Sequence, residues 1–260
     1  MEQKAETPAY MEALQLAGKI IMENGGETYR AEETICRMGQ GLGLSEVESF
    51  AVPSGLFISY RREEGMLETS VKRVYRQDRN LKRVDETNRV SRLVAAGEMG
   101  CGEALEELKK IEKMPGDFAK AWTIAAAFLC AAGFTALFGG GWIEIALAGL
   151  VAAVVQCVSK VTERLHMKWM TSAIAGGFLT ALLPALAMRL LPNLIRDAVF
   201  AGAVMPLVPG LAMTNAVQDA MRGDMVSGLS HGLQALLTAC MIAGGALLAS
   251  GLMRVLGGGI

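Results

Sequence analysis

The stretch that decides the fold is AVFAGAVMPLVPGLAMTNAVQDAMRGD, residues 198–224. Its first part carries no charge and is long enough to cross a bilayer core of about 30 Å. Pro206 and Pro209 lie in the middle of this apolar run. Each proline lacks an N–H and clashes with the carbonyl four residues earlier, so Gly202 and Met205 are predicted to lose their helical partners. The pattern therefore predicts a membrane helix that is broken near its centre, where protein or water must satisfy the freed groups.

Charged residues are distributed unevenly along the 260-residue chain. Residues 1–118 hold 17 of the 25 Lys and Arg and 21 of the 26 Asp and Glu, which leaves only 8 and 5 for residues 119–260. The apolar runs of the second half exceed what a soluble core requires and match repeated membrane spans. We therefore predict a cytoplasmic α+β domain over 1–118 and a polytopic α-helical membrane domain over 119–260.

Composition excludes several classes of function. The net charge of −1 argues against a nucleic-acid partner, because binding phosphates needs a basic surplus on one face. The five cysteines lack metal or disulfide spacing, and the chain shows no phosphate loop, so neither a metal nor another cofactor is expected. A basic run suits either a solvated helix face or contact with anionic lipid headgroups. It consists of Lys72, Arg73, Arg76, Arg79, Lys82 and Arg83.

The amino-terminal half opens without an apolar signal segment, so we expect it in the cytoplasm. Apolar spacing and turn residues predict the order helix, helix, strand, strand, helix, helix. The expected bounds are Pro8–Glu23, Thr28–Gly41, Ser49–Tyr60, Met66–Tyr75, Leu81–Ala96 and Cys101–Lys113. Glu27 and Arg30 follow a glycine pair and are either an ordinary helix start or part of a small-molecule site in this domain.

Five membrane spans are predicted in the second half, near 120–138, 142–158, 169–188, 194–217 and 229–253. With the amino terminus inside, the basic residues of the loops show a mild positive-inside bias and the carboxyl terminus lies outside. The inner set is Lys160, Arg164, Lys168 and Arg222, and the outer set is Arg189, Arg196 and Arg254.

Two spans carry patterned faces. Small residues recur every fourth position on the third span, which lets a neighbouring backbone approach closely. They are Ser172, Gly176, Thr180 and Pro184. A polar stripe on the fifth span must face protein or water. It consists of Ser227, His231, Gln234 and Thr238.

Polar residues after the proline break form the candidate substrate pathway. Asn215 and Asp219 are four apart and share a helix face, with Arg222 one turn further on. The unwound segment is expected to offer carbonyls, and the restarting helix its free N–H groups, to an anionic substrate group. Asp219 would then couple transport to protons or hold Arg222. The full predicted pathway is Pro206, Pro209, Gly210, Thr214, Asn215, Asp219, His231 and Gln234.

Glu144 is a second candidate coupling carboxylate, because it lies just inside the second span and intramembrane acids are costly. Plainer interpretations stay open for all of these residues. The prolines can simply kink a helix, Asp219 and Asp224 can lie in a solvated loop, and Glu144 can lie at headgroup level. His231 can be a packed hydrogen-bond partner instead of a proton carrier.

These residues resemble the signature of the threonine/serine exporter family. The membrane half carries Leu207-Val208-Pro209-Gly210, Thr214-Asn215-Ala216, Asp219, Gly223-Asp224 and Ser227-Gly228. The amino-terminal half carries Gly25-Gly26-Glu27-Thr28-Tyr29-Arg30, Val52-Pro53-Ser54-Gly55, Arg73-Val74 and the run from Glu103 to Ile111. The resemblance covers about residues 10–251. Its glycine and proline positions indicate the family as a set, whereas each position alone is a weak signal.

The resemblance implies gradient-driven export of a small polar metabolite, threonine or serine, across the bacterial inner membrane without ATP. Fused members carry about ten spans, so five spans resemble the longer subunit of the split form. A second, shorter membrane subunit would then be the partner, with a homo-oligomer as another arrangement. Some split members resemble exporters of dicarboxylates such as succinate, so the substrate stays open.

Two further functions are also left open. The amino-terminal domain can be a hydrolase anchored by the spans, although Ser54, Ser59 and Ser70 have no nearby histidine in the sequence. Alternatively, that domain senses the substrate and gates the membrane part.

Overall fold

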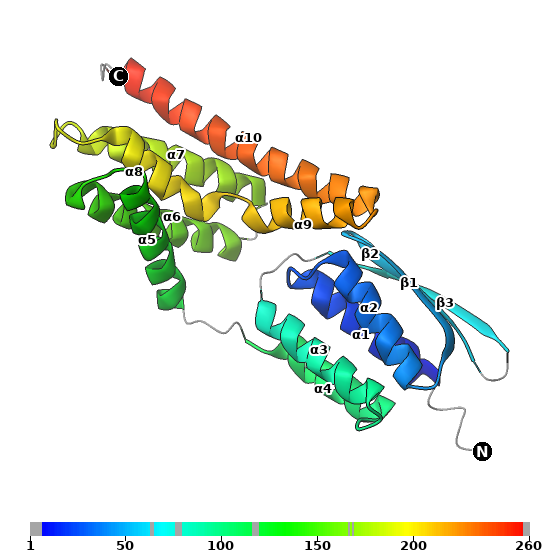
Figure 1. Ribbon diagram of the computed structural model, residues 1–260. Helices are drawn as coiled ribbons and strands as arrows, with labels where there is room; N and C mark the ends of the chain where they lie inside the picture. Colours follow the sequence, from blue (N-terminus) through cyan, green and yellow to red (C-terminus); the bar gives the residue numbers. More distant parts are fainter. Residues whose placement is uncertain are drawn as a thin grey trace. The chain divides into compact units, whose positions relative to one another are not determined.

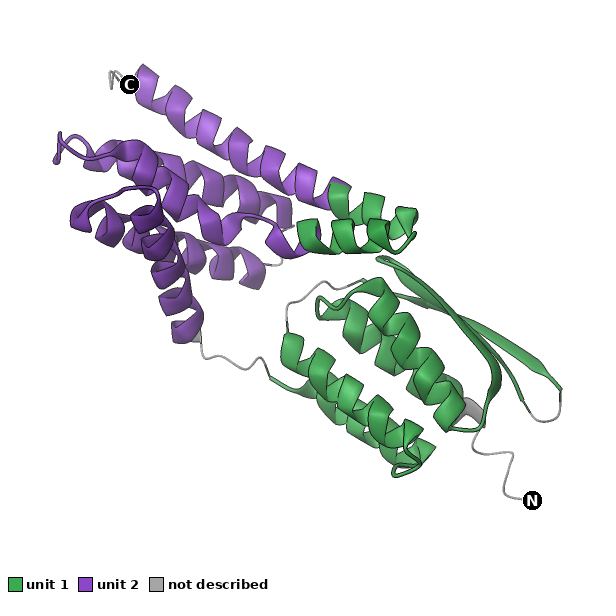
Figure 2. Cartoon of the chain, in the orientation of Figure 1, with its two compact units in different colours: residues 1–117, 213–232 green, residues 118–212, 233–260 purple. Residues whose placement is uncertain are grey.

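The computed structural model describes residues 7–62, 65–75, 80–115, 120–165, 167 and 169–256. The chain forms two compact units (Figure 2). Unit 1 comprises residues 1–117 and 213–232, and unit 2 comprises residues 118–212 and 233–260. The first part of unit 1 ends one residue before the domain boundary predicted from charge. The composition of the sequence does not indicate that residues 213–232 belong to this unit.

Unit 1 is a three-layered α+β arrangement (Figure 1). A three-stranded sheet is covered by α1 (Thr7–Glu23) and α2 (Thr28–Gly41), and α3 (Leu81–Ala95) and α4 (Cys101–Lys113) pack behind these helices. All four helices agree with the predicted ranges to within one residue. Apolar periodicity and the Asn24-Gly25-Gly26 stop signal were therefore sufficient to predict them.

The sheet corrects the prediction of two strands. It contains β1 (Ser45–Val52), β2 (Gly55–Arg61) and β3 (Leu67–Arg73) in antiparallel order. The expected strand Ser49–Tyr60 is in fact a hairpin that turns at Pro53-Ser54, with Val52 paired to Gly55. Proline cannot donate to a strand ladder, which ends β1 there.

The turn expected between the two predicted strands is found between β2 and β3. Gly65 has φ +82°, a left-handed conformation that favours glycine, and the N–H of Arg62 donates to the carbonyl of Met66 at 3.1 Å. Residues 63 and 64 of this predicted turn lie outside the described residues, as do Arg76 and Arg79 of the basic run.

The core of unit 1 lies between the sheet and the helices. Its largest fully buried side chains include Leu14, Ile35, Leu56 and Tyr60. Gly18 allows α1 to approach α2 closely, because a Cβ at this position would lie 2.6 Å from Cδ1 of Ile35. Burial of this apolar surface stabilises the unit by roughly 25 cal/mol per Å² removed from water.

Unit 2 contains α5 (Lys120–Leu137), α6 (Trp142–Arg164), α7 (Trp169–Ala187), α8 (Arg196–Val204) and the short 3₁₀ helix η1 (Met205–Leu207). The chain then continues into α9 (Gly210–Met221) and α10 (Met225–Val255), each of which has part of its length in either unit.

Among the described residues, α6, α7 and α10 are long and apolar enough to cross a membrane. The bent pair formed by 196–207 and 210–221 brings the number to four if it is one span, and Ala121–Leu137 is a shorter apolar helix. The lengths and compositions of these helices therefore support three or four spans, and α5 is the helix that separates this number from the expected five. Lys168, which was predicted to face inward, lies outside the described residues.

The predicted break in the fourth span is confirmed. The two helical parts meet at a bend of 60°, with η1 and Val208-Pro209 between them. The expectation of freed carbonyls is wrong, however. The N–H of Met205 donates to the carbonyl of Gly202, and the N–H of Val208 donates to the carbonyl of Met205 at 3.2 Å. Short-range 3₁₀ bonds thus take over where the prolines remove α-helical ones.

Close helix contacts in unit 2 run through glycines. A Cβ at Gly177 of α7 would lie 2.1 Å from the carbonyl oxygen of Ile242 in α10, and one at Gly245 of α10 would lie 2.1 Å from that of Ile174. Gly176, Thr180 and Pro184 of the predicted small-residue stripe are buried. The stripe therefore lies in a packed interface, as small residues in membrane helices favour.

Candidate functional site

The site lies in unit 1, where the turn between α9 and α10 meets the start of α2 and the end of β1. Gly223 makes the turn with φ +90°, and Asp224 caps α10 by accepting the N–H of Ser227 at 3.0 Å. The two helices cross closely, because a Cβ at Gly228 would lie 3.0 Å from the carbonyl oxygen of Ala216. This packing holds the polar side chains of both helices in place.

Asp219 is the centre of the site. Its side chain is only 1% exposed, and both carboxylate oxygens are occupied. Thr28 Oγ1 donates to Oδ1 at 2.9 Å, and Nδ1 of His231 lies 2.9 Å from Oδ2. The three side chains come from α2, α9 and α10, so the carboxylate joins helices that are far apart in the sequence. Asp219 therefore does not lie in a solvated loop.

Arg222 has a different partner from the one expected. Its guanidinium lies 3.4 Å from the ring centroid of Tyr29. Such a cation–π contact is worth about 0.5–2 kcal/mol, depending on its exposure to water. Since both oxygens of Asp219 are bonded to Thr28 and His231, the predicted role of Asp219 in holding Arg222 is replaced by a contact with Tyr29.

Glu32 and Ser227 extend the site to the sheet. The backbone N–H of Ala51 donates to Glu32 Oε1 at 2.7 Å, and the buried hydroxyl of Ser227 lies 3.5 Å from the carbonyl oxygen of Ala51. Burial raises the pKa of Glu32, the N–H of Ala51 opposes that shift, and the carboxylates of Asp224 and Asp219 add to it. The site thus gathers three carboxyl groups, those of Glu32, Asp219 and Asp224.

Among the described residues, no group of three or more His, Cys, Asp and Glu side chains is placed to hold a metal ion. The contacts that the site does show join a buried carboxylate to a hydroxyl and an imidazole, with the guanidinium of Arg222 on the neighbouring ring of Tyr29.

The predicted pathway residues divide between the units. Thr214, Asn215, Asp219 and His231 belong to unit 1, and Asp219 and His231 are in direct contact. Asn215 is buried, whereas Thr214 is exposed. The remaining four belong to unit 2, namely Pro206, Pro209, Gly210 and Gln234. The backbone carbonyl of Gln234 accepts the hydroxyl of Thr238 at 2.8 Å, within α10.

Glu144 joins two segments of unit 2 through a hydrogen bond. It lies in the first turn of α6, is 8% exposed, and accepts the backbone N–H of Ile195 at 3.1 Å through Oε1. A carboxylate near a helix amino terminus is favourable because of the exposed N–H groups there. Its contacts therefore tie the start of α6 to the residue before α8.

Glu27 and Arg30 form a local ion pair, with 2.8 Å between Arg30 Nε and Glu27 Oε2. The residues between them, Thr28 and Tyr29, are the ones that contact Asp219 and Arg222. The side chains of this segment that reach α9 and the α9–α10 turn are therefore Thr28 and Tyr29, not the predicted Glu27 and Arg30. The signal available was the Gly25-Gly26-Glu27-Thr28-Tyr29-Arg30 run itself, since helical phase alone does not say which residues face a distant segment.

Comparison with known proteins identifies the family. The model of the family described as "Putative threonine/serine exporter" matches residues 12–253, nearly the whole chain. The chain belongs to the threonine/serine exporter family. With its several long apolar helices, this member of a transporter family is a multi-pass membrane protein.

Relatives of the chain carry two kinds of name. "Probable threonine/serine exporter" of Mycobacterium tuberculosis is 24% identical over 68% of this chain, which spans only 33% of the length of that relative. "Probable succinate transporter subunit YjjP" of Escherichia coli K12 is 25% identical over 82% of this chain and 83% of its own length. The Klebsiella aerogenes protein of the same name is 25% identical over 81% of each chain. No solved structure matches this chain.

Proposed function

We propose that this protein is one subunit of a two-component secondary exporter and not an enzyme. The observation that carries the proposal is the match over more than four-fifths of both chains to proteins named as transporter subunits, within an exporter family. A second, shorter membrane subunit would complete the pathway. The proposed cargo is a small polar metabolite. Threonine or serine is the first candidate, and a dicarboxylate such as succinate is the alternative.

The proposed membrane arrangement has five spans, formed by α5, α6, α7, the bent pair α8–α9 and α10, in a bacterial inner membrane. The amino-terminal domain is cytoplasmic and the carboxyl terminus lies outside. The contact between Thr28 and Asp219 supports an even number of crossings between the amino-terminal domain and the α9–α10 turn, since it requires both to lie on the same side of the membrane. That is the side to which counting from a cytoplasmic amino terminus assigns this turn.

The proposed coupling centre is the pair Asp219 and His231. A second proton on the His231 ring turns its contact with the buried Asp219 carboxylate into an ion pair. Loss of that proton leaves the carboxylate with Thr28 and a neutral ring. Because the three groups lie on α2, α9 and α10, proton occupancy would change how firmly these helices are held together. This links a proton gradient to movement of the helices that follow the break.

Flux measurement tests the function. Proteoliposomes containing the chain, with and without a co-reconstituted shorter membrane subunit, are loaded with labelled serine, threonine or succinate, and release is followed under an imposed pH gradient. We expect gradient-dependent release of one of these compounds when both subunits are present. Absence of such release for all three, with both subunits correctly inserted, would overturn the proposal.

The same assay tests the coupling centre. Asp219→Asn keeps the size of the side chain and removes its charge, so gradient-dependent flux should fall by at least tenfold, or about 1.4 kcal/mol of transition-state stabilisation. Asp197→Asn, at a carboxylate in the first turn of α8, is the matched control and should retain flux. Normal flux through Asp219→Asn would show that the coupling centre lies elsewhere.

A further inference from the structure

A cavity in unit 1, separate from the Asp219 site, is lined by an excess of positive charge. Its volume is about 360 Å³, at the lower end of the range for small-molecule sites. Helices α1, α3 and α4 and the end of β3 supply the walls. The lining residues are Lys19, Ile20, Glu23, Asn24, Lys72, Arg73, Tyr75, Arg83 and Glu112.

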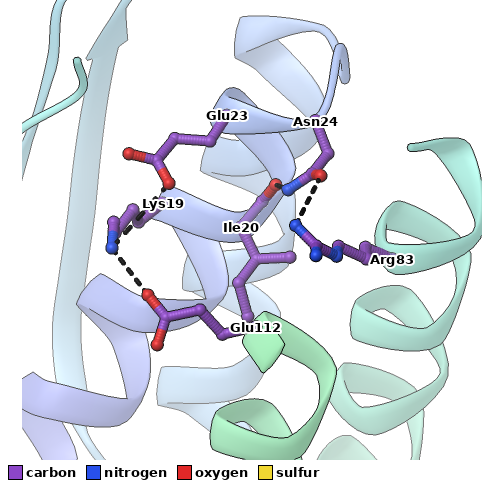
Figure 3. A network of polar contacts seen from close by, with 6 residues as sticks. All are labelled: Lys19, Ile20, Glu23, Asn24, Arg83 and Glu112. Atoms are coloured by element: carbon purple, nitrogen blue, oxygen red, sulfur yellow. Dashed lines mark hydrogen bonds and ion pairs between the residues drawn. The ribbon is translucent and has the colours of Figure 1, made fainter. Parts of the chain in front are cut away.

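The acidic residues of the cavity already have a cationic partner. Figure 3 shows Lys19 between Glu23 and Glu112, with Nζ 2.6 Å from Glu112 Oε1 and 3.8 Å from Glu23 Oε2. One lysine thus serves both carboxylates. The surplus positive charge of the cavity therefore rests on Lys72 and Arg73 of β3 and on Arg83 of α3.

Arg83 is held in place on the other side of Ile20 (Figure 3). Its Nη1 donates to Asn24 Oδ1 at 3.3 Å, and its Nη2 donates to the carbonyl of Met114. Asn24 is itself fixed, because its Nδ2 donates to the carbonyl of Ile20 at 2.7 Å. The Nε–H of Arg83 is buried and has no hydrogen-bond partner. A positioned guanidinium with spare donor capacity is a typical binding group for carboxylate or phosphate oxygens.

We propose that this cavity binds a small, doubly charged oxyanion, a dicarboxylate or a phosphate-bearing metabolite. Lys72 and Arg83, on two different elements, hold its oxygens, while Lys19 neutralises Glu23 and Glu112. The assignment explains part of the basic run that was predicted to be a solvated face or a lipid contact. It does not rest on the proposed transport function, since it concerns binding within unit 1.

Equilibrium binding to the full-length chain in detergent tests the site. Sodium succinate and inorganic phosphate are titrated separately by calorimetry, with 4-aminobutyrate as a zwitterionic control of the same chain length as succinate. We expect saturable binding of at least one dianion, no comparable binding of 4-aminobutyrate, and weakening of dianion binding as salt is added, because partly exposed charges are screened. The two dianion titrations distinguish the carboxylate from the phosphate form of the ligand.

Variants locate the binding. Lys72→Gln and Arg83→Gln should each weaken dianion binding by about tenfold or more, because each removes a charge-assisted contact. Lys82→Gln is the matched control from the same basic run, since Lys82 does not line the cavity. If Arg83→Gln fails to fold, Lys72→Gln alone decides.

Three results would overturn the proposal. The first is absence of saturable binding of both dianions. The second is binding that Lys72→Gln leaves unchanged. The third is dianion binding that is kept in nanodiscs of neutral lipid but abolished in nanodiscs with anionic lipid, which would assign these cations to lipid headgroups.

Discussion

At the scale of single residues, the most informative contact joins Thr28 and Asp219, which are 191 positions apart. A carboxylate that is 1% exposed depends on its hydrogen bonds, because burying a charge without partners is costly. Thr28 and His231 supply those partners. The stability of unit 1 and the proposed coupling therefore depend on the same few atoms.

Thr28→Val tests how much this hydrogen bond stabilises the protein. Valine keeps the shape of threonine but leaves Asp219 Oδ1 without its donor. We expect a loss of about 1–3 kcal/mol in the free energy of unfolding, measured by thermal denaturation of the full chain. Thr28→Ser retains the hydroxyl and should lose less. Equal losses in the two variants would show that packing of the methyl group, and not the hydrogen bond, matters.

The raised pKa of Glu32 should make the stability of the protein depend on pH. Its pKa is raised above the usual value of about 4.3, so the folded chain binds this proton more tightly than the unfolded chain. The stabilisation from this group is complete below the usual pKa and is lost as pH rises through the raised value. Glu32→Gln removes the charge and keeps an acceptor for the N–H of Ala51.

The Glu32→Gln variant should therefore gain stability relative to the native chain as pH rises from 4 to 8. Differences in Tm across this range measure the effect. Glu33→Gln, at a more exposed neighbour, is the control. A constant Tm difference between Glu32→Gln and the native chain would contradict the proposed protonation of Glu32.

At the scale of elements, the broken span and the glycine crossing have different physical causes. The break follows from two prolines, and short 3₁₀ bonds satisfy the carbonyls of Gly202 and Met205. The crossing of α7 and α10 depends on Gly177 and Gly245, where the opposing backbone leaves no room for a Cβ. The break thus arises because proline has no backbone N–H, and the close crossing is possible because glycine has no side chain.

Adjacent glycines of α10 test the crossing. Gly245→Ala would place a Cβ 2.1 Å from the carbonyl oxygen of Ile174, whereas a Cβ at Gly244 meets nothing within 4 Å. We expect Gly245→Ala to destabilise the protein by about 1–3 kcal/mol through overpacking. Gly244→Ala should be neutral or slightly stabilising. Thermal unfolding in detergent compares the two, and similar Tm values would contradict the close approach.

At the scale of the whole molecule, unit 1 takes in residues 213–232 from the other half of the chain. The proposed five-span arrangement is consistent with this, since it puts the α9–α10 turn and the amino-terminal domain in one compartment. The number of spans is the part of the proposal that the lengths of the helices support least directly, because α5 is short for a span.

Labelling with an impermeant maleimide tests the arrangement. In a chain whose five native cysteines are replaced, Gly140→Cys and Leu190→Cys should react in intact cells, because both are predicted to lie outside. Arg222→Cys and Glu103→Cys should react only after the membrane is opened. A reactive Glu103→Cys in intact cells would reverse the proposed orientation.

Sequence alone was enough to predict the features that depend on neighbouring residues. The uneven distribution of charge separates the two halves, apolar periodicity predicts α1 to α4, and Pro206 and Pro209 break the fourth span. The family could also be inferred, because its glycines and prolines mark backbone turns that no other residues make as easily.

Only the tertiary structure decided which distant groups meet. It showed that Asp219 bonds Thr28 and His231, that Arg222 lies on Tyr29, and that three basic residues of one local run line a cavity. Helical spacing says which side chains share a face but not what that face packs against. The partners of Asp219 are set by the packing of α2, α9 and α10, which depends on surfaces brought together from both ends of the chain.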